Sequence, residues 1–486
     1  MARVVVVGAG LGGLAAAARL AAGGHRVTVL EQTPEVGGKL GWFARDGHGF
    51  DTGPSLVTLP QVFRDLFAAT GAPLDDVLDL VRLDPAVSYR FADGTRLAVP
   101  GDLERVRPAL GPEWAAFLDR AAEMWRVTEQ PFLRSPLEGA RTLARLARST
   151  ADVGTVAPWS SLRGLGTRYL TDPRLRVLLD RYATYSGSDP RRAPAALATV
   201  PYVEQAFGSW YVRGGLRRLA LAVADRAVER GAEVRTSTAV TRVLVEGGRT
   251  TGVQLADGSR LPADVVVANA DATALYDRLL PRDAPVRRAR AALARATPSS
   301  SGFVLLLALR GRTPGAAHHT VLFPADYDAE FDGLFTHPRP LADPTVYVSS
   351  PDDPATRPDA DSESWFVLVN APRHEPGRGV DWDAPGLADS YADRVLQVLA
   401  DRGLDVRDRV RWREVRTPAD LGRATGSVGG SIYGTSSNGA RAAFLRPANA
   451  SPLPGLFLVG GSAHPGGGLP LVALSAEIVS GLVGPA

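Results

Sequence analysis

The first thirty residues show a pattern of apolar and glycine positions that predicts a strand, a helix and a second strand. Residues 4–7 are consecutive valines, which is typical of a buried strand. An alanine-rich stretch then predicts a helix that ends near Gly23, and a second apolar run at residues 27–30 ends at Glu31. This order predicts a βαβ unit built on a parallel sheet.

Further along the chain, alternating or glycine-bounded runs predict more strands. An expected hairpin comprises residues 87–91 and 95–99, around Asp93-Gly94. Residues 233–236, 240–246, 251–255 and 263–269 predict a four-stranded meander, and residues 303–309 and 365–370 predict two buried strands. A helical pattern occupies residues 112–206, and a last strand at 456–459 precedes a helix that begins near Leu469.

Composition narrows the possible functions. The chain has 486 residues, 45% of them hydrophobic, so it is expected to form about two to four domains. It has no cysteine, which excludes disulfides, iron–sulfur clusters and thiolate chemistry. A formal net charge of +3 does not predict nucleic-acid binding. No apolar run approaches the ~20 residues of a membrane span, so we expect a soluble or peripheral protein.

The glycines after the first strand predict a dinucleotide site. Gly8, Gly10 and Gly13 have the spacing that allows a tight turn, close approach of a pyrophosphate and close packing of helix on strand. Glu31 is placed to accept hydrogen bonds from ribose hydroxyls, and its charge argues against NADP. The alternative is an ordinary glycine-rich turn between strand and helix.

Two later glycine-rich segments favour a flavin over NAD. Gly37-Gly38-Lys39 and residues 49–54 follow the βαβ unit, and residues 460–468 form a second glycine-rich turn that leads into a helix. N–H groups at the start of that helix would stabilise negative charge on a reduced flavin. An ordinary glycine-rich loop is the alternative here too.

Together these segments resemble the phytoene desaturase family of bacterial-type carotenoid desaturases, which is related to flavin amine oxidases. The resemblance rests on residues 4–31, 37–39, 49–54, 210–215, 263–271 and 455–472. It implies that FAD is bound, with its ADP half held by Gly8, Gly10, Leu11, Gly12, Gly13, Glu31, Gly38 and Lys39, and its adenine by the backbone of Val240. It also implies that Gly53, Pro54, Gly460, Gly461, Gly468 and Leu469 surround the flavin.

The same resemblance implies desaturation of an acyclic carotenoid, phytoene or a later C30 or C40 intermediate, by hydride transfer to flavin N5. Related amine oxidases usually carry an acid directly after the glycine at Gly461, and this chain has Ser462, which favours the desaturase branch. His464 is the one catalytic candidate, and ordering of the glycine loop is its alternative role. Candidate substrate-binding aromatics are Trp159, Tyr182, Tyr185, Phe207, Trp210 and Tyr211. The histidines lack metal-ligand spacing, so no metal is expected.

Three other activities remain open: 3,4-desaturation of a hydroxylated carotenoid, a flavin-dependent isomerisation without net oxidation, and amine oxidation. We expect oxygen or a quinone as the electron acceptor. Because the substrate is lipophilic, we expect a cytoplasmic protein attached peripherally to the inner face of the cell membrane. Residues 135–149 predict a basic amphipathic helix for that contact, with Leu137, Leu143 and Leu146 on one face and Arg134, Arg141, Arg145 and Arg148 on another.

The expected fold class is therefore α/β, with a discontinuous Rossmann-like FAD-binding domain, an inserted mixed-sheet substrate domain and a helical cap. The FAD-binding domain is expected at residues 1–85, 211–290 and 441–486. The substrate domain is expected at 86–130 and 291–440. The cap, a candidate membrane-facing element, is expected at 131–210.

Overall fold

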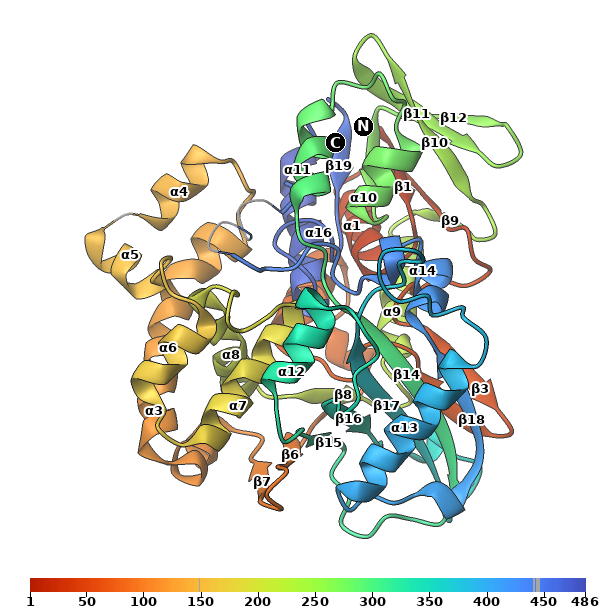
Figure 1. Cartoon of the computed structure of the whole chain (residues 1–486). Helices are drawn as coiled ribbons and strands as arrows, with labels where there is room; N and C mark the ends of the chain where they lie inside the picture. Colours follow the sequence, from red (N-terminus) through yellow and green to blue (C-terminus); the bar gives the residue numbers. More distant parts are fainter. Residues whose placement is uncertain (148, 440–441, 443–445) are drawn as a thin grey trace.

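A five-stranded parallel sheet brings together segments from the start, middle and end of the chain (Figure 1). The computed structural model describes residues 1–147, 149–439, 442 and 446–486. The strand order is β19-β13-β1-β2-β9. The strands are β1 (Arg3–Val7), β2 (Arg26–Leu30), β9 (Glu233–Arg235), β13 (Val265–Ala268) and β19 (Leu456–Leu458). The predicted βαβ unit and the α/β fold class are confirmed.

The valines of β1 explain why this sheet is covered on both faces. Val4 and Val6 pack among helices, whereas Val5 and Val7 pack against a second layer of strands. The helices of the first face are α1 (Leu11–Ala22), α2 (Pro60–Thr70), α9 (Arg217–Glu229) and α16 (Leu469–Val483). The second layer is an antiparallel sheet of β10 (Val240–Glu246), β11 (Arg249–Leu255) and β12 (Arg260–Pro262).

The predicted four-stranded meander is therefore wrong. Only its two middle strands pair as expected, and β12 is their third partner. Strand β9 joins the edge of the parallel sheet beside β2, and β13 lies between β1 and β19. The apolar run that was predicted as the fourth strand, at Val265–Ala268, is buried by pairing on both sides rather than by the meander.

A separate, seven-stranded mixed sheet has the strand order β18-β14-β17-β16-β15-β6-β7. Its strands are β6 (Val87–Arg90), β7 (Arg96–Val99), β14 (Ser301–Arg310), β15 (His319–Leu322), β16 (Val346–Ser349), β17 (Ser362–Ala371) and β18 (Val410–Arg416). The predicted hairpin and both predicted buried strands are confirmed. Helix α13 (Leu387–Asp401) packs on one face through Tyr391, Val395 and Leu399.

Smaller elements connect these layers. Two short ribbons pair β3 (Trp42–Arg45) with β4 (His48–Asp51) and β5 (Leu80–Arg82) with β8 (Trp210–Val212). The remaining helices near the sheets are α10 (Ala272–Ala274), α11 (Arg287–Arg295), α12 (Asp328–Phe331) and α14 (Pro418–Thr425).

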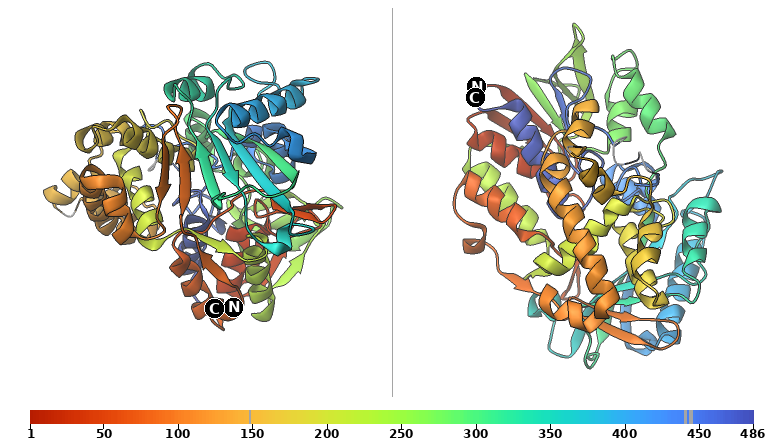
Figure 2. Two further views of the ribbon diagram at one scale, coloured as in Figure 1. Left: turned by 90° about the horizontal axis from the view of Figure 1, so that it is seen from below. Right: turned by 90° about the vertical axis from the view of Figure 1, so that its left-hand side faces the viewer.

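A lobe of helices stands beside the seven-stranded sheet, as the left view of Figure 2 shows. It contains α3 (Leu103–Thr128), α4 (Ala140–Leu146), α5 (Thr150–Val156), α6 (Leu162–Tyr169), α7 (Pro173–Arg181) and α8 (Thr199–Phe207). The helical prediction is confirmed, although α3 begins earlier and is broken at Gly111, where φ is 82°. Because α3 packs against α8, residues on both sides of the predicted boundary at 130 share one core; the domain boundaries stay a prediction.

The prediction of one amphipathic helix over residues 135–149 is wrong. Helix α4 spans only Ala140–Leu146, because Gly139 before it has φ 58° and Ser149 after it is extended and caps α5. Arg134 lies outside the helix in ion pairs, and Arg148 lies outside the described residues. Within the described residues, no helix is both long and apolar enough to cross a membrane.

The packing of α1 on β1 generates a stability prediction. A Cβ added at Gly13 would lie 2.2 Å from the Gly8 carbonyl oxygen, so Gly13→Ala should lower the free energy of unfolding by about 1–3 kcal/mol. Gly154→Ala is the matched control, because a Cβ at that position in α5 meets nothing within 4 Å. Thermal unfolding of both variants measures the difference, and equal midpoints would contradict the close approach.

Candidate functional site

Three glycine-rich segments that are distant in sequence meet at one end of the parallel sheet. The Gly37 N–H donates to the Ala9 carbonyl oxygen at 2.9 Å. A Cβ at Gly38 would lie 3.2 Å from Gly10 Cα, and a Cβ at Gly12 would lie 3.1 Å from Gly460 Cα. Helices α1 and α16 pack side by side behind this point (Figure 1). The structure thus brings together the predicted cofactor residues of all three segments.

The two helix starts at this point leave N–H groups free for a ligand. Helix α1 begins after Gly10 and α16 after Gly468, and neither start is capped by a side chain. A Cβ at Gly468 would meet no atom of the described residues within 4 Å. Unpaired N–H groups and the helix dipole favour negative charge there, which fits a pyrophosphate at α1 and the electron-rich edge of a flavin at α16.

Glu31 lies at the end of β2 with its carboxylate almost fully buried. It accepts hydrogen bonds from the Ala9 N–H at 2.8 Å and from both the N–H and the hydroxyl of Thr33 at 2.9 Å. A carboxylate has four acceptor positions, so it can still accept from a ribose hydroxyl. Val240 begins β10 close by, because the Thr238 N–H donates to the Glu31 carbonyl oxygen at 2.7 Å. Their roles toward a nucleotide stay predictions.

Lys39 supplies a half-buried positive charge beside the same segments. Its Nζ donates to the Ile432 carbonyl oxygen at 2.5 Å, and a Cβ at Gly53 would lie 2.0 Å from the Lys39 carbonyl oxygen. Burial lowers the pKa of Lys39 to about 8, although the charge of Asp271 opposes the shift. An anionic group bound near Nζ would raise this pKa again.

Two positioning residues escaped the sequence analysis. Asn269 follows β13 and donates from Nδ2 to the Gly8 carbonyl oxygen at 3.4 Å, and its side chain lies against Gly10, Gly12 and Gly460. A polar residue directly after a buried parallel strand was the available signal, since strand ends meet at one sheet edge.

The second is Arg446, whose buried guanidinium bonds to backbone carbonyls among the residues that the structure describes. It donates to the carbonyl oxygens of Gly461 at 2.7 Å, Thr435 at 2.8 Å and Tyr433 at 3.0 Å. Burial lowers its pKa to about 10, so it remains charged at neutral pH. It ties the 460–468 loop to residues 433–435, and nothing in the local sequence indicated this.

His464 is fully buried, and its ring holds two segments together. Nε2 lies 2.8 Å from the Phe132 carbonyl oxygen and 3.0 Å from that of Ser135, so it carries the proton and donates. Burial lowers its pKa to about 4, which keeps the ring neutral at neutral pH. This geometry matches the ordering role, and a catalytic role stays a prediction.

The candidate substrate aromatics do not form one wall. Tyr182 and Tyr185 contact each other with ring centroids 5.4 Å apart, and Trp210 Nε1 donates to the Phe207 carbonyl oxygen in a second group. Tyr211 is buried and its hydroxyl donates to Asp353 at 3.1 Å. Trp159 is 66% exposed on the surface, apart from the other aromatics, and its role toward a substrate stays a prediction.

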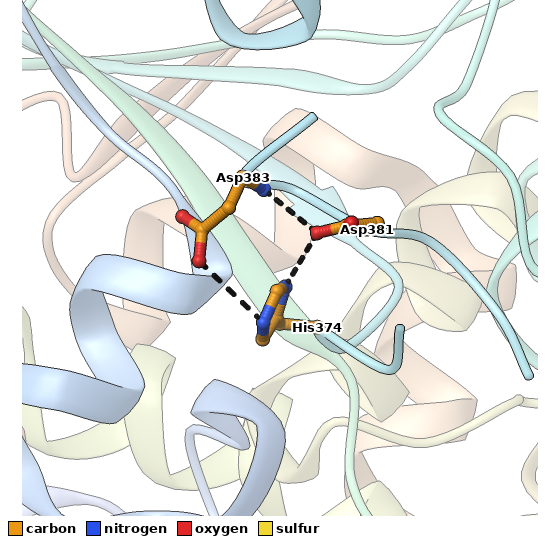
Figure 3. A group of neighbouring side chains, drawn as sticks. All are labelled: His374, Asp381 and Asp383. Atoms are coloured by element: carbon orange, nitrogen blue, oxygen red, sulfur yellow. Dashed lines mark hydrogen bonds and ion pairs between the residues drawn. The ribbon is translucent and has the colours of Figure 1, made fainter. Parts of the chain in front are cut away.

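One cluster has the composition of a metal site, and Figure 3 shows how its side chains lie. His374 Nδ1 accepts the Trp382 N–H at 3.2 Å, so the other ring nitrogen carries a proton and faces Asp383 at 3.7 Å. Arg423 already contacts both carboxylate oxygens of Asp383, at 2.9 and 3.1 Å. Since the histidine nitrogens and this carboxylate are engaged, we assign no metal here.

Comparison with known proteins adds a family and a set of relatives. The family described as flavin-containing amine oxidoreductase matches residues 11–483. A hydroxyneurosporene desaturase of Rubrivivax gelatinosus is 35% identical over 98% of this chain and 92% of its own. A 4,4'-diapolycopene oxygenase of Methylomonas sp is 34% identical over 98% and 97%, and a zeta-carotene-forming phytoene desaturase of Myxococcus xanthus is 34% identical over 98% and 93%. A solved putrescine oxidase shares the fold, with a TM-score of 0.66 at 18% identity over 99% of this chain and 98% of its own.

Lys39 generates a pH prediction for FAD binding. If protonated Lys39 faces the FAD anion, the affinity should be constant below about pH 8 and fall by up to about tenfold per pH unit above it, as the free amine loses its proton. Fluorescence titration of the apoprotein with FAD at several pH values measures this dependence. Lys39→Met should bind more weakly without the slope, and Lys39→Arg, which stays charged, should also lack it. An unchanged slope in Lys39→Met would contradict the assignment.

Proposed function

The chain belongs to the family of flavin-containing amine oxidoreductases, and on that basis we propose that it is an FAD-dependent enzyme that desaturates an acyclic carotenoid. The observation that carries the proposal is the similarity to named carotenoid desaturases over nearly the full length of this chain. Ser462, in place of an acid after Gly461, supports the desaturase branch.

Bound FAD would supply the oxidation, by accepting a hydride from one carbon while the adjacent carbon loses a proton and a double bond forms. The chain's own residues bind and orient the cofactor. The starts of α1 and α16 offer N–H groups to its anionic parts, and Glu31 offers an acceptor to its ribose. Lys39 balances its charge, and Asn269 and Arg446 hold the glycine-rich segments in register.

A second candidate is oxygenation of the carotenoid, because a relative that is 34% identical to this chain is named a 4,4'-diapolycopene oxygenase. Hydroxylated carotenoids are a further candidate substrate class, because one relative is named a hydroxyneurosporene desaturase. Isomerisation and amine oxidation remain as outcomes that the product mass distinguishes.

The activity prediction is tested by expression in bacterial cells that accumulate phytoene, lycopene or a 1-hydroxylated acyclic carotenoid. Desaturation should lower the product mass by two hydrogens per new double bond and shift the absorbance to longer wavelength. Gly10→Val, whose side chain would collide with Asn269, is the control without bound FAD. A gain of oxygen would identify the oxygenase, an unchanged mass the isomerase, and unchanged pigment from a flavin-loaded protein would contradict carotenoid chemistry.

We also propose peripheral attachment to the cytoplasmic face of the cell membrane, with oxygen or a membrane quinone reoxidising the flavin. Support comes from the end of the helical lobe around α4 and α5 (Figure 1), where Arg141 has 83% of its side chain exposed and Trp159 is 66% exposed. Tryptophan and arginine are the residues that suit the boundary between lipid headgroups and acyl chains.

Liposome flotation tests this attachment. The wild-type protein should float with vesicles of anionic lipid, less so as salt rises, and Trp159→Ala with Arg141→Glu should reduce flotation severalfold. Val228→Ala is the matched control, because Val228 is 54% exposed on α9, away from the lobe. Equal flotation of the double variant and the control would rule out this surface as the anchor.

A further inference from the structure

Arg181, at the end of α7, is a buried cation enclosed by tyrosines. Only 5% of the residue is exposed, and its guanidinium carbon lies 4.9 Å from the ring centroid of Tyr185, 5.5 Å from that of Tyr89 and 5.6 Å from that of Tyr182. Nη1 donates to the Tyr89 hydroxyl at 3.0 Å and Nη2 to the Tyr185 hydroxyl at 2.9 Å. These two bonds use two of the five N–H groups of the guanidinium.

The balancing charge is Glu204 on α8, which is 2% exposed. The Tyr185 hydroxyl donates to Glu204 Oε2 and the Tyr182 hydroxyl to Oε1, both at 2.7 Å. Tyr185 therefore accepts from the arginine and donates to the glutamate. Burying a cation and an anion costs several kcal/mol in desolvation, and well-packed apolar residues would serve packing at lower cost.

This group of residues lies next to the segments expected at the flavin. Tyr185, Tyr347 and Tyr433 are each half-buried, so part of each side chain stays accessible. A Cβ at Gly187, two residues after Tyr185, would lie 3.0 Å from the Tyr433 ring. The Tyr347 hydroxyl contacts Ser55 Oγ at 2.5 Å, two residues after Gly53, and a Cβ at Gly467 would lie 2.3 Å from the Tyr433 ring. The charge of Arg181 acts on both tyrosines, opposing the rise in pKa that burial causes.

We propose that Arg181 and Tyr185 form a subsite that binds an oxygen atom, of a hydroxyl or carbonyl group, at one end of the polyene substrate. The unused N–H groups of Arg181 are donors, and such an oxygen accepts from them. Because the subsite adjoins the flavin segments, the new double bond forms near the oxygen-bearing end. This inference rests on the proposed function for its substrate class.

The test compares two acyclic polyenes with the same carbon skeleton and conjugation, one a hydrocarbon and one with a tertiary hydroxyl at an end. Both are given to the FAD-loaded protein. The wild type should prefer the hydroxylated compound by about tenfold or more in kcat/KM. Arg181→Gln and Tyr185→Phe should each remove most of that preference, measured as the ratio of kcat/KM for the two polyenes. The product, analysed by mass fragmentation, should carry its new double bond at the hydroxylated end.

Tyr276→Phe is the matched control, because it also removes a partly buried hydrogen bond of a tyrosine hydroxyl. The Tyr276 hydroxyl donates to Ser451 at 3.1 Å, in the core behind the parallel sheet. Its preference ratio should equal that of the wild type. Equal rates of the wild type on the two polyenes, or a Tyr185→Phe ratio equal to that of Tyr276→Phe, would overturn the subsite. If Arg181→Gln does not fold, Tyr185→Phe decides.

Binding separates this inference from the proposed function. Perturbation of the flavin absorbance reports binding of each polyene without turnover. Tyr185-dependent binding of the hydroxylated compound with no product would refute the desaturase and retain the subsite. Desaturation of both compounds with no dependence on Tyr185 would support the desaturase and refute the subsite.

Discussion

The approach of backbone to backbone at the start of α1 is the constraint on which the rest of the structure depends. Gly13 lies against the Gly8 carbonyl, Gly38 against Gly10, and Gly460 against Gly12, at separations that leave no room for a side chain. These contacts bring the first, second and last parts of the chain to one sheet edge. The same absence of side chains leaves the N–H groups of α1 and α16 open toward an anionic ligand. Folding and cofactor binding therefore require the same glycines.

The cations near this edge of the parallel sheet form their hydrogen bonds mostly to carbonyl or hydroxyl oxygens rather than to carboxylates. Lys39, the one lysine in the sequence, bonds to backbone carbonyls, as does Arg446. Burial lowers the pKa of both, which shows that these oxygens compensate the lost hydration only in part. An anionic cofactor beside them would complete the compensation. A positive interior at this edge is thus consistent with a site built for a dinucleotide.

The sequence predicted those features that depend on local pattern. The valines of β1, the glycine turn, Glu31 and the hairpin of β6 and β7 lie as expected because each is specified by neighbours in the chain. The pairing of β9 with β2, and of β13 with β1 and β19, was missed. An apolar strand does not indicate which distant strand will pair with it. Helix α4 was predicted too long because periodicity outweighed the breaks at Gly139 and Ser149. The positions of Asn269 and Arg446, and the link from Arg181 through Tyr185 to Glu204, depend on contacts between distant segments, which no local pattern carries.

The fold alone does not determine the substrate, because a putrescine oxidase has the same fold at 18% identity. The polar groups near the expected flavin do discriminate. An ammonium group donates protons and needs acceptors, whereas the groups still able to bond at Arg181 are donors and the Tyr185 proton is already given to Glu204. A charged amine beside this guanidinium would also meet a like charge at close range. The polar groups described around Arg181 therefore suit an uncharged chain that ends in an acceptor oxygen better than they suit an amine.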